Sequence, residues 1–250
     1  MRFAIIGGTG FYEASQTKPE SRALRTDYGE VKVDIIQVGD EPVVFLPRHG
    51  REHSIAPHKI NYRANIAALR ELGIKNVLAS AAVGSLNSAM APGELALPTQ
   101  FIDFTYGRES TFFDGDEVRH LDMTEPYCPS LREAMLNCAL ALDLSIHPGA
   151  VYVCTQGPRF ETPAEIELFR RAGGDLVGMT GVPEVVLARE MGLCYASLAL
   201  IANRAAGLGE GPISHTEVSA LVKRQISVVR ELFFSVIAAY DRSDCACCQT

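Results

Sequence analysis

Apolar and polar positions along the chain fall into two patterns, one typical of buried strands and one of amphipathic helices. Short continuous apolar runs predict strands covered on both faces. They lie at 3–6, 32–37, 42–46, 76–80, 96–102, 149–153, 175–178 and 194–201. Helical spacing predicts helices at about 60–72, 130–143, 163–172, 183–192 and 216–240. This alternation predicts an α/β fold with helices packed on a central sheet.

Two of the predicted helices begin with capping signals. Ser214 is followed by Glu217, which is a capping-box spacing and places His215 at the first turn of the last helix. Thr162-Pro163-Ala164-Glu165 is a second capping box, with proline at the first helical position. The sequence has no internal repeat or linker, so we predict one domain over 1–240 and a cysteine-rich tail over 241–250.

Composition and charge narrow the class of protein. With 250 residues, 47% hydrophobic and 21% charged, the chain has an ordinary globular composition. Its formal charge of −7 opposes non-specific attraction to nucleic acid or to an anionic membrane. No apolar run approaches 18 residues and the N-terminus lacks a signal-peptide pattern, so we expect a soluble cytoplasmic protein.

The cysteines form two groups. Four are scattered among apolar segments, where buried thiols pack as small hydrophobic groups; they are Cys128, Cys138, Cys154 and Cys194. The other three lie in the tail "DCACCQT" and are Cys245, Cys247 and Cys248. The tail offers neither a second ligand pair nor a histidine, which argues against a zinc site there. A frayed, reactive tail is the first interpretation, and a disulfide within the tail is the alternative.

The segment "FAIIGGTGFYE", residues 3–13, runs from a strand into a glycine loop. Glycines let backbone N–H groups approach an anion, and Thr9 adds a hydroxyl donor. A dinucleotide fold is the competing interpretation, but Glu13 stands where its fingerprint needs a third glycine and would face a pyrophosphate. A plain structural turn is the third possibility.

Two further strand ends could also hold an anion. "PRHGREHSIAPH", residues 47–58, follows a predicted strand and gathers the donors Arg48, His49, Arg51 and His53. A guanidinium can bind two phosphate oxygens, although a solvated basic loop is the alternative. "ASAAVGSL", residues 79–86, ends a strand in small residues that permit close backbone approach. Three such strand ends in one α/β chain suggest a site for free phosphate.

Six segments occur in the order "IIGGTGF", "RHGREH", "SAAVGSL", "EPYCP", "QGPRFETPAE" and "VGMTGVPEVVLARE". In this order the chain resembles the trimeric purine nucleoside phosphorylase and methylthioadenosine phosphorylase family from about residue 3 to about residue 235. The resemblance implies a single-domain three-layer α/β/α sandwich with a mixed central sheet, a homo-oligomer built on a trimer, no metal and no organic cofactor.

The resemblance also assigns residues to phosphorolysis, in which phosphate displaces a purine from C1′ of the sugar. The positions that it implies for phosphate are Thr9, Arg48, His49, Ala82 and Thr180. Met179 corresponds to the residue packed against the ribose, and Phe160 belongs to the substrate-binding block. His49 and Asn203 are the residues expected to serve catalysis. The protein must hold phosphate below the sugar and relieve charge on the leaving base, so no side-chain nucleophile is needed.

Three positions bear on the base. Family members that act on 6-aminopurines have aspartate where this chain has Asn203, and the methylthioadenosine enzymes have a second aspartate at Ala205. The Asn203 amide can donate to O6 or N7 of a 6-oxopurine but cannot supply a proton. Glu161 corresponds to the glutamate that accepts from N1–H, which adenine lacks. Structural alternatives are an Asn in a turn and an acidic residue near a helix N-terminus.

Two histidines bear on the 5′ end of the substrate. His215 corresponds to a residue that hydrogen-bonds a ribose 5′-hydroxyl, whereas methylthio-specific relatives have an apolar residue there. His120 matches a position that reaches the 5′ pocket of a neighbouring subunit. A surface histidine at a helix start is the alternative for His215.

These residues predict a phosphate-dependent phosphorylase of inosine and guanosine, with inorganic phosphate as co-substrate. The first alternative is an S-methyl-5′-thioinosine phosphorylase, which differs only in the 5′ pocket. More distant alternatives are an NAD-binding oxidoreductase and a nucleoside-binding module without activity.

Overall fold

The structure is a computed structural model that describes residues 1–8, 19–241 and 245, together with the backbone but not the side chain of His215. Thr9, Glu13, Cys247 and Cys248 therefore lie outside the described residues.

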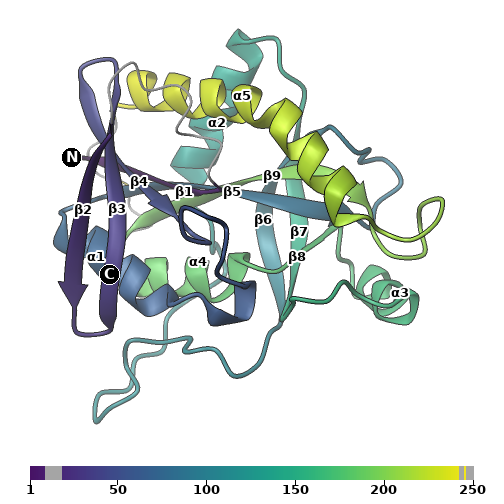
Figure 1. Ribbon diagram of the computed structural model, residues 1–250, viewed down its shortest axis with the longest axis horizontal. Helices are drawn as coiled ribbons and strands as arrows, with labels where there is room; N and C mark the ends of the chain where they lie inside the picture. The colour runs from purple at the N-terminus through teal and green to yellow at the C-terminus, as the bar shows by residue number, and fades with distance from the viewer. Residues whose placement is uncertain (9–18, 242–244, 246–250) are drawn as a thin grey trace.

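Most of the described strands belong to one mixed sheet (Figure 1). They are β1 (Phe3–Gly7), β2 (Glu20–Thr26), β3 (Gly29–Val38), β4 (Glu41–Pro47), β5 (Asn76–Ser85), β6 (Leu95–Phe104), β7 (Ile146–Thr155), β8 (Leu176–Gly178) and β9 (Cys194–Arg204). The sheet order is β2-β3-β4-β1-β5-β8-β7-β6-β9, and β9 also pairs with β5. That additional pairing closes β5, β8, β7, β6 and β9 into a ring at one end of the sheet.

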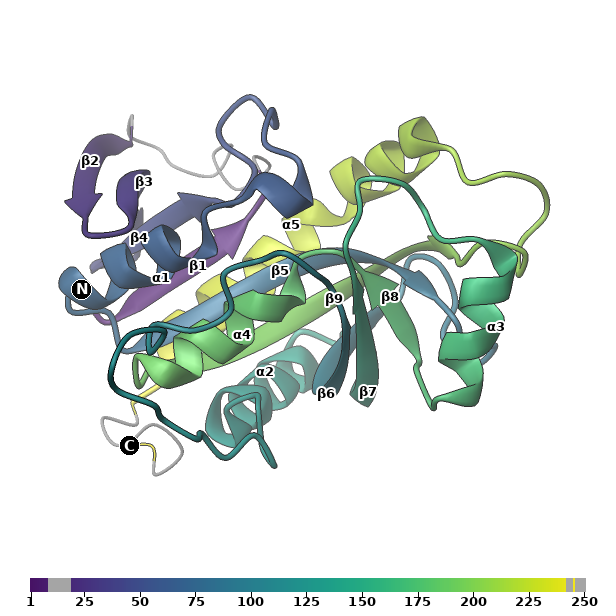
Figure 2. The same ribbon diagram turned by 90° about the horizontal axis from the view of Figure 1, so that it is seen from below.

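Helices cover both faces of the sheet and make it the middle of three layers (Figures 1 and 2). They are α1 (Tyr62–Glu71), α2 (Pro129–Ala141), α3 (Pro163–Arg171), α4 (Gly181–Glu190) and α5 (His215–Ala239). α1 packs beside α4 on one face, and α2 packs beside α5 on the other. α3 lies at the ring end, near β7 and β8 (Figure 2). The expected mixed α/β fold in one domain is confirmed.

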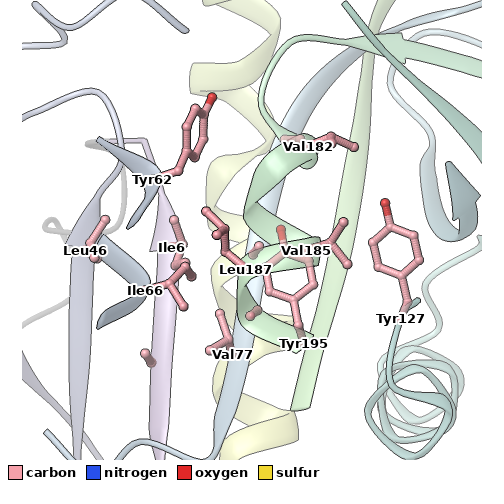
Figure 3. Close-up of a cluster of buried hydrophobic side chains, with 14 of the residues drawn as sticks. Ile6, Leu46, Tyr62, Ile66, Val77, Tyr127, Val182, Val185, Leu187 and Tyr195 are labelled. Atoms are coloured by element: carbon pink, nitrogen blue, oxygen red, sulfur yellow. The ribbon is translucent and has the colours of Figure 1, made fainter. Parts of the chain in front are cut away.

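The core is divided by the sheet into two large apolar clusters. One lies under α1 and α4 and includes Ile6, Ile66, Val185 and Leu187 (Figure 3). The other lies under α2 and α5 and is built from side chains such as Phe3, Phe45, Leu198 and Phe233. The central strands β1 and β5 are buried almost throughout, as their continuous apolar sequences predict.

The helix starts agree with their sequences. Thr162 and Glu165 form both hydrogen bonds of a capping box before α3. The Ser214 side chain accepts from the backbone N–H of Glu217 before α5. Strand β2 was not predicted, because its sequence "ESRALRT" is polar and largely exposed. None of the helices in the described part of the chain is long and apolar enough to cross a membrane.

Candidate active site

A buried ion pair lies at the carboxyl ends of the central strands. Arg48 directly follows β4, and its Nε and Nη2 donate to the two carboxylate oxygens of Glu184 on α4 over 2.6 Å each. The two side chains are 3% and 1% exposed, so this bidentate pair is fully removed from water. The Tyr195 hydroxyl donates to the same carboxylate over 2.7 Å. Figure 3 shows Tyr195 beside α4.

The charges of this group are matched inside the protein. Burial works to lower the pKa of Arg48, but the adjacent Glu184 carboxylate outweighs it and holds that pKa above its usual value. Burial, and then the charge of Glu184, raise the pKa of Tyr195 well above its usual value. Arg48 therefore stays charged and Tyr195 stays a donor throughout the physiological pH range.

Arg48 is tied to two neighbouring strands. Its backbone N–H donates to the Gly7 carbonyl at the end of β1 over 3.1 Å. Its Nη1 donates to the Ser80 carbonyl in β5 over 2.8 Å. A guanidinium has five N–H donors. Three of them are used by Glu184 and Ser80, which leaves two within the described residues for an anion.

The other phosphate positions that the sequence predicts lie around this pair. Ala82 is exposed although its neighbours Ala81 and Val83 in β5 are buried, so the strand is accessible to solvent at this position. Thr180 is buried and immediately precedes α4, the helix that carries Glu184. β8 runs antiparallel to β5 from Val177 opposite Gly84, which directs the chain through Met179 and Thr180 back toward Ala82 and Ser80.

His49 lies next to Arg48 and is held in one orientation. Its Nδ1 lies 2.8 Å from the Ile55 carbonyl, and its ring stacks on His53 with 4.6 Å between centroids. Burial, and then the positive charge of Arg48, lower the pKa of His49 to about 4 against the opposing Ile55 hydrogen bond. The ring is therefore neutral near pH 7, with Nδ1–H as donor and Nε2 as acceptor.

Glu161 lies in the loop between the end of β7 and the start of α3. It is buried, and its Oε1 accepts from the Thr155 hydroxyl over 2.6 Å. A cavity of about 220 Å³ opens here; its lining includes Phe104, Tyr106, Thr155, Gln156, Gly157, Arg159, Glu161 and Phe169. The side chain of Phe160 is 38% exposed. Met179 packs over Gly157, where any side chain would meet the Met179 Sδ at 2.6 Å. Met179 thus contacts Gly157, a residue that lines the same cavity as Glu161.

Asn203 lies next to the last residue of β9. It is half-buried and pairs with Gly84 across β5 and β9, and its Nδ2 donates to the Arg204 carbonyl over 2.6 Å. A Cβ on Gly84 would lie 3.2 Å from Val177 and 3.4 Å from the Asn203 amide, so the glycine leaves space for this side chain. Ala205 is buried, and its N–H donates to Ser85.

Strand register brings most of the predicted residues to the part of β5 that pairs with β8. Arg48 contacts Ser80 in β5, Asn203 lies opposite Gly84, and the chain through Met179 and Thr180 leaves β8 beside Ala82. Glu161 joins this region through Thr155 at the end of β7, which pairs with β8. His120 is exposed in the loop between β6 and α2, and no described contact joins it to these residues. A larger cavity, of about 450 Å³, contains none of the predicted residues; it lies beside α1 and is lined by both acidic and basic groups, including Asp27, Lys59, Arg63 and Glu109.

Sequence reasoning missed three supporting residues. Glu184 is an acid within the apolar run "GVPEVVLA", a position that could have indicated a buried partner for a cation. Nothing in the sequence around Thr155 indicated that its hydroxyl would contact Glu161. Arg108 was also missed: it donates to the carbonyls of Val182, Thr155 and Gln156 and holds the 105–112 loop against the site.

Comparison with known proteins agrees with this geometry. A family model described as the Phosphorylase superfamily matches residues 2–238, so the chain belongs to that superfamily. It is 49% identical to the 6-oxopurine nucleoside phosphorylase of Pyrococcus furiosus, over 94% of this chain and 92% of the relative. It is 53% identical to a probable S-methyl-5′-thioinosine phosphorylase of Methanopyrus kandleri, over 88% and 85%.

Solved structures with the same fold include methylthioadenosine phosphorylase from Schistosoma mansoni in complex with adenine. That structure superimposes with a TM-score of 0.90 at 34% identity and covers 96% of this chain and 93% of its own. The family expected from the sequence is confirmed, and an oxidoreductase is no longer a candidate.

Proposed function

We propose that this protein cleaves 6-oxopurine nucleosides with inorganic phosphate and releases the free base and ribose 1-phosphate. The observation that supports the proposal is that a buried acceptor, Glu161, and a half-buried amide, Asn203, belong to segments that pair around the same stretch of β5 that Arg48 contacts. The relatives named as 6-oxopurine nucleoside phosphorylases support the same substrate class.

Phosphate would bind at Arg48, where two N–H donors are left after the bonds to Glu184 and Ser80. The exposed Ala82 in β5 lies near this guanidinium, which contacts Ser80 two residues earlier. His49, with its neutral ring, offers Nε2 to a protonated phosphate oxygen. We also assign Thr9 and the Thr180 hydroxyl to phosphate, because the family resemblance implies both positions.

The leaving purine would be recognised at the opposite end of the site. The Glu161 carboxylate, oriented by Thr155, accepts from N1–H of hypoxanthine or guanine. The Asn203 amide donates to O6 or N7, where negative charge develops as the glycosidic bond breaks. Adenine has no N1–H, so it would leave a buried carboxylate without its partner. Phe160 and Met179 provide apolar surface for base and ribose.

The 5′ group distinguishes the two candidate substrates. We place inosine and guanosine first, because His215 at the start of α5 suits a hydroxyl better than a thioether. Methylthioinosine is the second candidate, supported by relatives named as probable S-methyl-5′-thioinosine phosphorylases. We further propose a cytoplasmic homo-oligomer in which His120 of one copy contributes to the 5′ pocket of the next, working without metal or organic cofactor in catalysis.

The test is an assay of purified protein with inosine, guanosine, adenosine, methylthioinosine and methylthioadenosine, each with and without phosphate. We expect hypoxanthine and ribose 1-phosphate from inosine only when phosphate is present. Equal turnover in phosphate-free buffer would overturn the phosphorylase assignment. Absence of turnover with every nucleoside, combined with measurable binding, would instead indicate a nucleoside-binding module.

A further inference from the structure

Three cysteines that are far apart in the sequence meet at the opposite side of the sheet from the α1 and α4 layer. Cys128 directly precedes α2, Cys194 is the first residue of β9, and Cys245 follows α5. Their three sulfur atoms all lie within 4.8 Å of one another, and the Sγ atoms of Cys128 and Cys245 are 3.5 Å apart. No other group of potential metal ligands is gathered so closely in the described residues.

Two of the three positions are fixed by the backbone. The N–H of Cys128 donates to the Tyr195 carbonyl over 2.8 Å, which joins the start of α2 to the start of β9. The N–H of Cys194 donates to the Lys75 carbonyl over 2.9 Å. The two side chains are only 1% and 5% exposed. Cys245 is half-buried, so a cation could enter from its side and meet two sulfur atoms that are already in place.

We propose that Cys128, Cys194 and Cys245 form a structural zinc site that fastens the C-terminal tail to the α2 and β9 corner. Tetrahedral zinc thiolates have Zn–S bonds of about 2.3 Å, which places neighbouring sulfur atoms about 3.8 Å apart. The Cys128–Cys245 separation of 3.5 Å is close to that value, and the remaining separations of at most 4.8 Å leave about 1 Å or less for the side chains to close.

The chemistry balances without an oxidant. Zn²⁺ binds three thiolates as three protons leave to solvent, and the site then has a net charge of −1. The Ser130 hydroxyl, 3.5 Å from the Cys245 sulfur in the first turn of α2, can turn to donate to a thiolate. The N-terminus of α2 also favours negative charge at Cys128. A water molecule would complete the tetrahedron.

The expectation from sequence was that the tail has no second ligand pair, and the proposed site departs from it. The fold supplies that pair from Cys128 and Cys194, which the sequence placed in the apolar core. They are indeed buried in the cluster under α2 and α5. The role is structural, since Cys128 and Cys194 stand at the ends of α2 and β9 that lie away from Glu161 and Asn203.

The experiment uses the full chain without a histidine tag, reduced with a phosphine and freed of metal. It is titrated with Co²⁺ as a spectroscopic probe and then with Zn²⁺ as competitor. We expect one Co²⁺ per chain, with thiolate charge-transfer absorption and the intense ligand-field bands of a tetrahedral site, and full displacement by Zn²⁺. Cys245→Ser should weaken binding by more than the ~10- to 100-fold that loss of an orienting partner costs.

Three controls keep the outcome interpretable. Cys138→Ser, on the same helix α2 but outside the cluster, should retain the site. A Cys247→Ser/Cys248→Ser double variant should retain it as well. Circular dichroism of the metal-free Cys245→Ser variant should show the native fold. Binding that survives in Cys245→Ser or binding lost only in the double variant would overturn the proposal. So would a disulfide between two of the three cysteines, found by peptide mapping of the protein as isolated, before reduction.

Discussion

The two ends of the candidate site are built in opposite ways. At the phosphate end, the side chains of Arg48 and Glu184 are 3% and 1% exposed, and the guanidinium donates to Glu184 and to the Ser80 carbonyl inside the protein. At the base end, Glu161 opens onto a cavity of about 220 Å³ whose lining includes the exposed side chains of Arg159, Tyr106 and Leu168.

This difference in burial indicates which substitutions should affect the stability of the fold and which should affect the choice of substrate. A charge buried in a matched pair cannot be removed without leaving its partner desolvated, so the phosphate end supports the fold as well as the ligand. When a hydrogen-bonding group in the wall of an open cavity is substituted, water can take the place of the lost hydrogen bond. We therefore expect substitutions at the phosphate end to change both folding and catalysis, and substitutions at the base end to change the choice of substrate.

The largest effect is expected for Arg48→Ala. The variant leaves the Glu184 carboxylate buried without its cation, which should lower the free energy of unfolding by about 3–5 kcal/mol. It should also raise the KM for phosphate, since a charge-assisted contact of about 1.5–3 kcal/mol is lost. Urea denaturation and steady-state kinetics measure the two effects.

Arg171→Ala is the matched control, because this guanidinium is 77% exposed and pairs with Glu167 at the surface. It should change stability by less than about 0.5 kcal/mol. If Arg48→Ala is too unstable to assay, Arg48→Lys keeps the charge but loses the fork and should raise the phosphate KM alone. A phosphate KM that neither variant changes would remove Arg48 from the anion site.

A smaller effect, confined to substrate choice, is expected for Asn203→Asp. A carboxylate can accept from a 6-amino group, so the ratio of kcat/KM for adenosine to that for inosine should rise by about 10- to 100-fold, or about 1.4–2.8 kcal/mol. The switch should be incomplete because Glu161 still requires an N1–H. Asn137→Asp makes the same change on the exposed side of α2 and should leave the ratio unaltered. A wild-type protein that cleaves adenosine as fast as inosine would refute this role for Asn203 and Glu161.

The same contrast explains what the sequence could and could not predict. Continuous apolar runs identified β1, β5 and β9, because burial on both faces leaves a local signal. The polar edge strand β2 has no such signal and depends on pairing with β3. The ring closed by β5 and β9 likewise depends on contacts remote in sequence.

At the site, the short motifs that carry the family resemblance predicted Arg48, Glu161 and Asn203 as parts of one site. The partners that fix them were harder to find. Glu184 lies 136 residues after Arg48, and no spacing rule connects the two. The cysteine cluster shows the same limit, since 117 residues separate Cys128 from Cys245. Local patterns thus predict the candidate ligand-binding groups, while the buried groups that orient them are specified by topology.

The His215→Val substitution tests the third part of the candidate site, the 5′ pocket. If the imidazole meets a 5′-hydroxyl, wild-type protein should prefer inosine over methylthioinosine by about 5- to 150-fold, or about 1–3 kcal/mol. Valine should erase the preference. His147→Val, at the start of β7 and thus at the opposite end of that strand from Thr155, is the control and should preserve it. A wild-type ratio that favours methylthioinosine would make the thioinosine phosphorylase the better assignment.

The smallest effect concerns the pH dependence of stability at the phosphate end. Burial first, and then the charge of Arg48, lower the pKa of His49 from 6.5 to about 4 in the folded protein. Between these values the unfolded chain binds a proton that the folded chain does not, so stability should fall as pH falls from about 6.5 toward 4. Because the ring is only partly buried, solvent screening should limit the loss to about 1–2 kcal/mol. Denaturant unfolding of wild type and His49→Gln at pH 7 and pH 5 isolates this contribution from that of the carboxylates. We expect the variant to lose less stability than wild type over that interval, and an equal loss would mean that His49 titrates alike in the folded and unfolded chain.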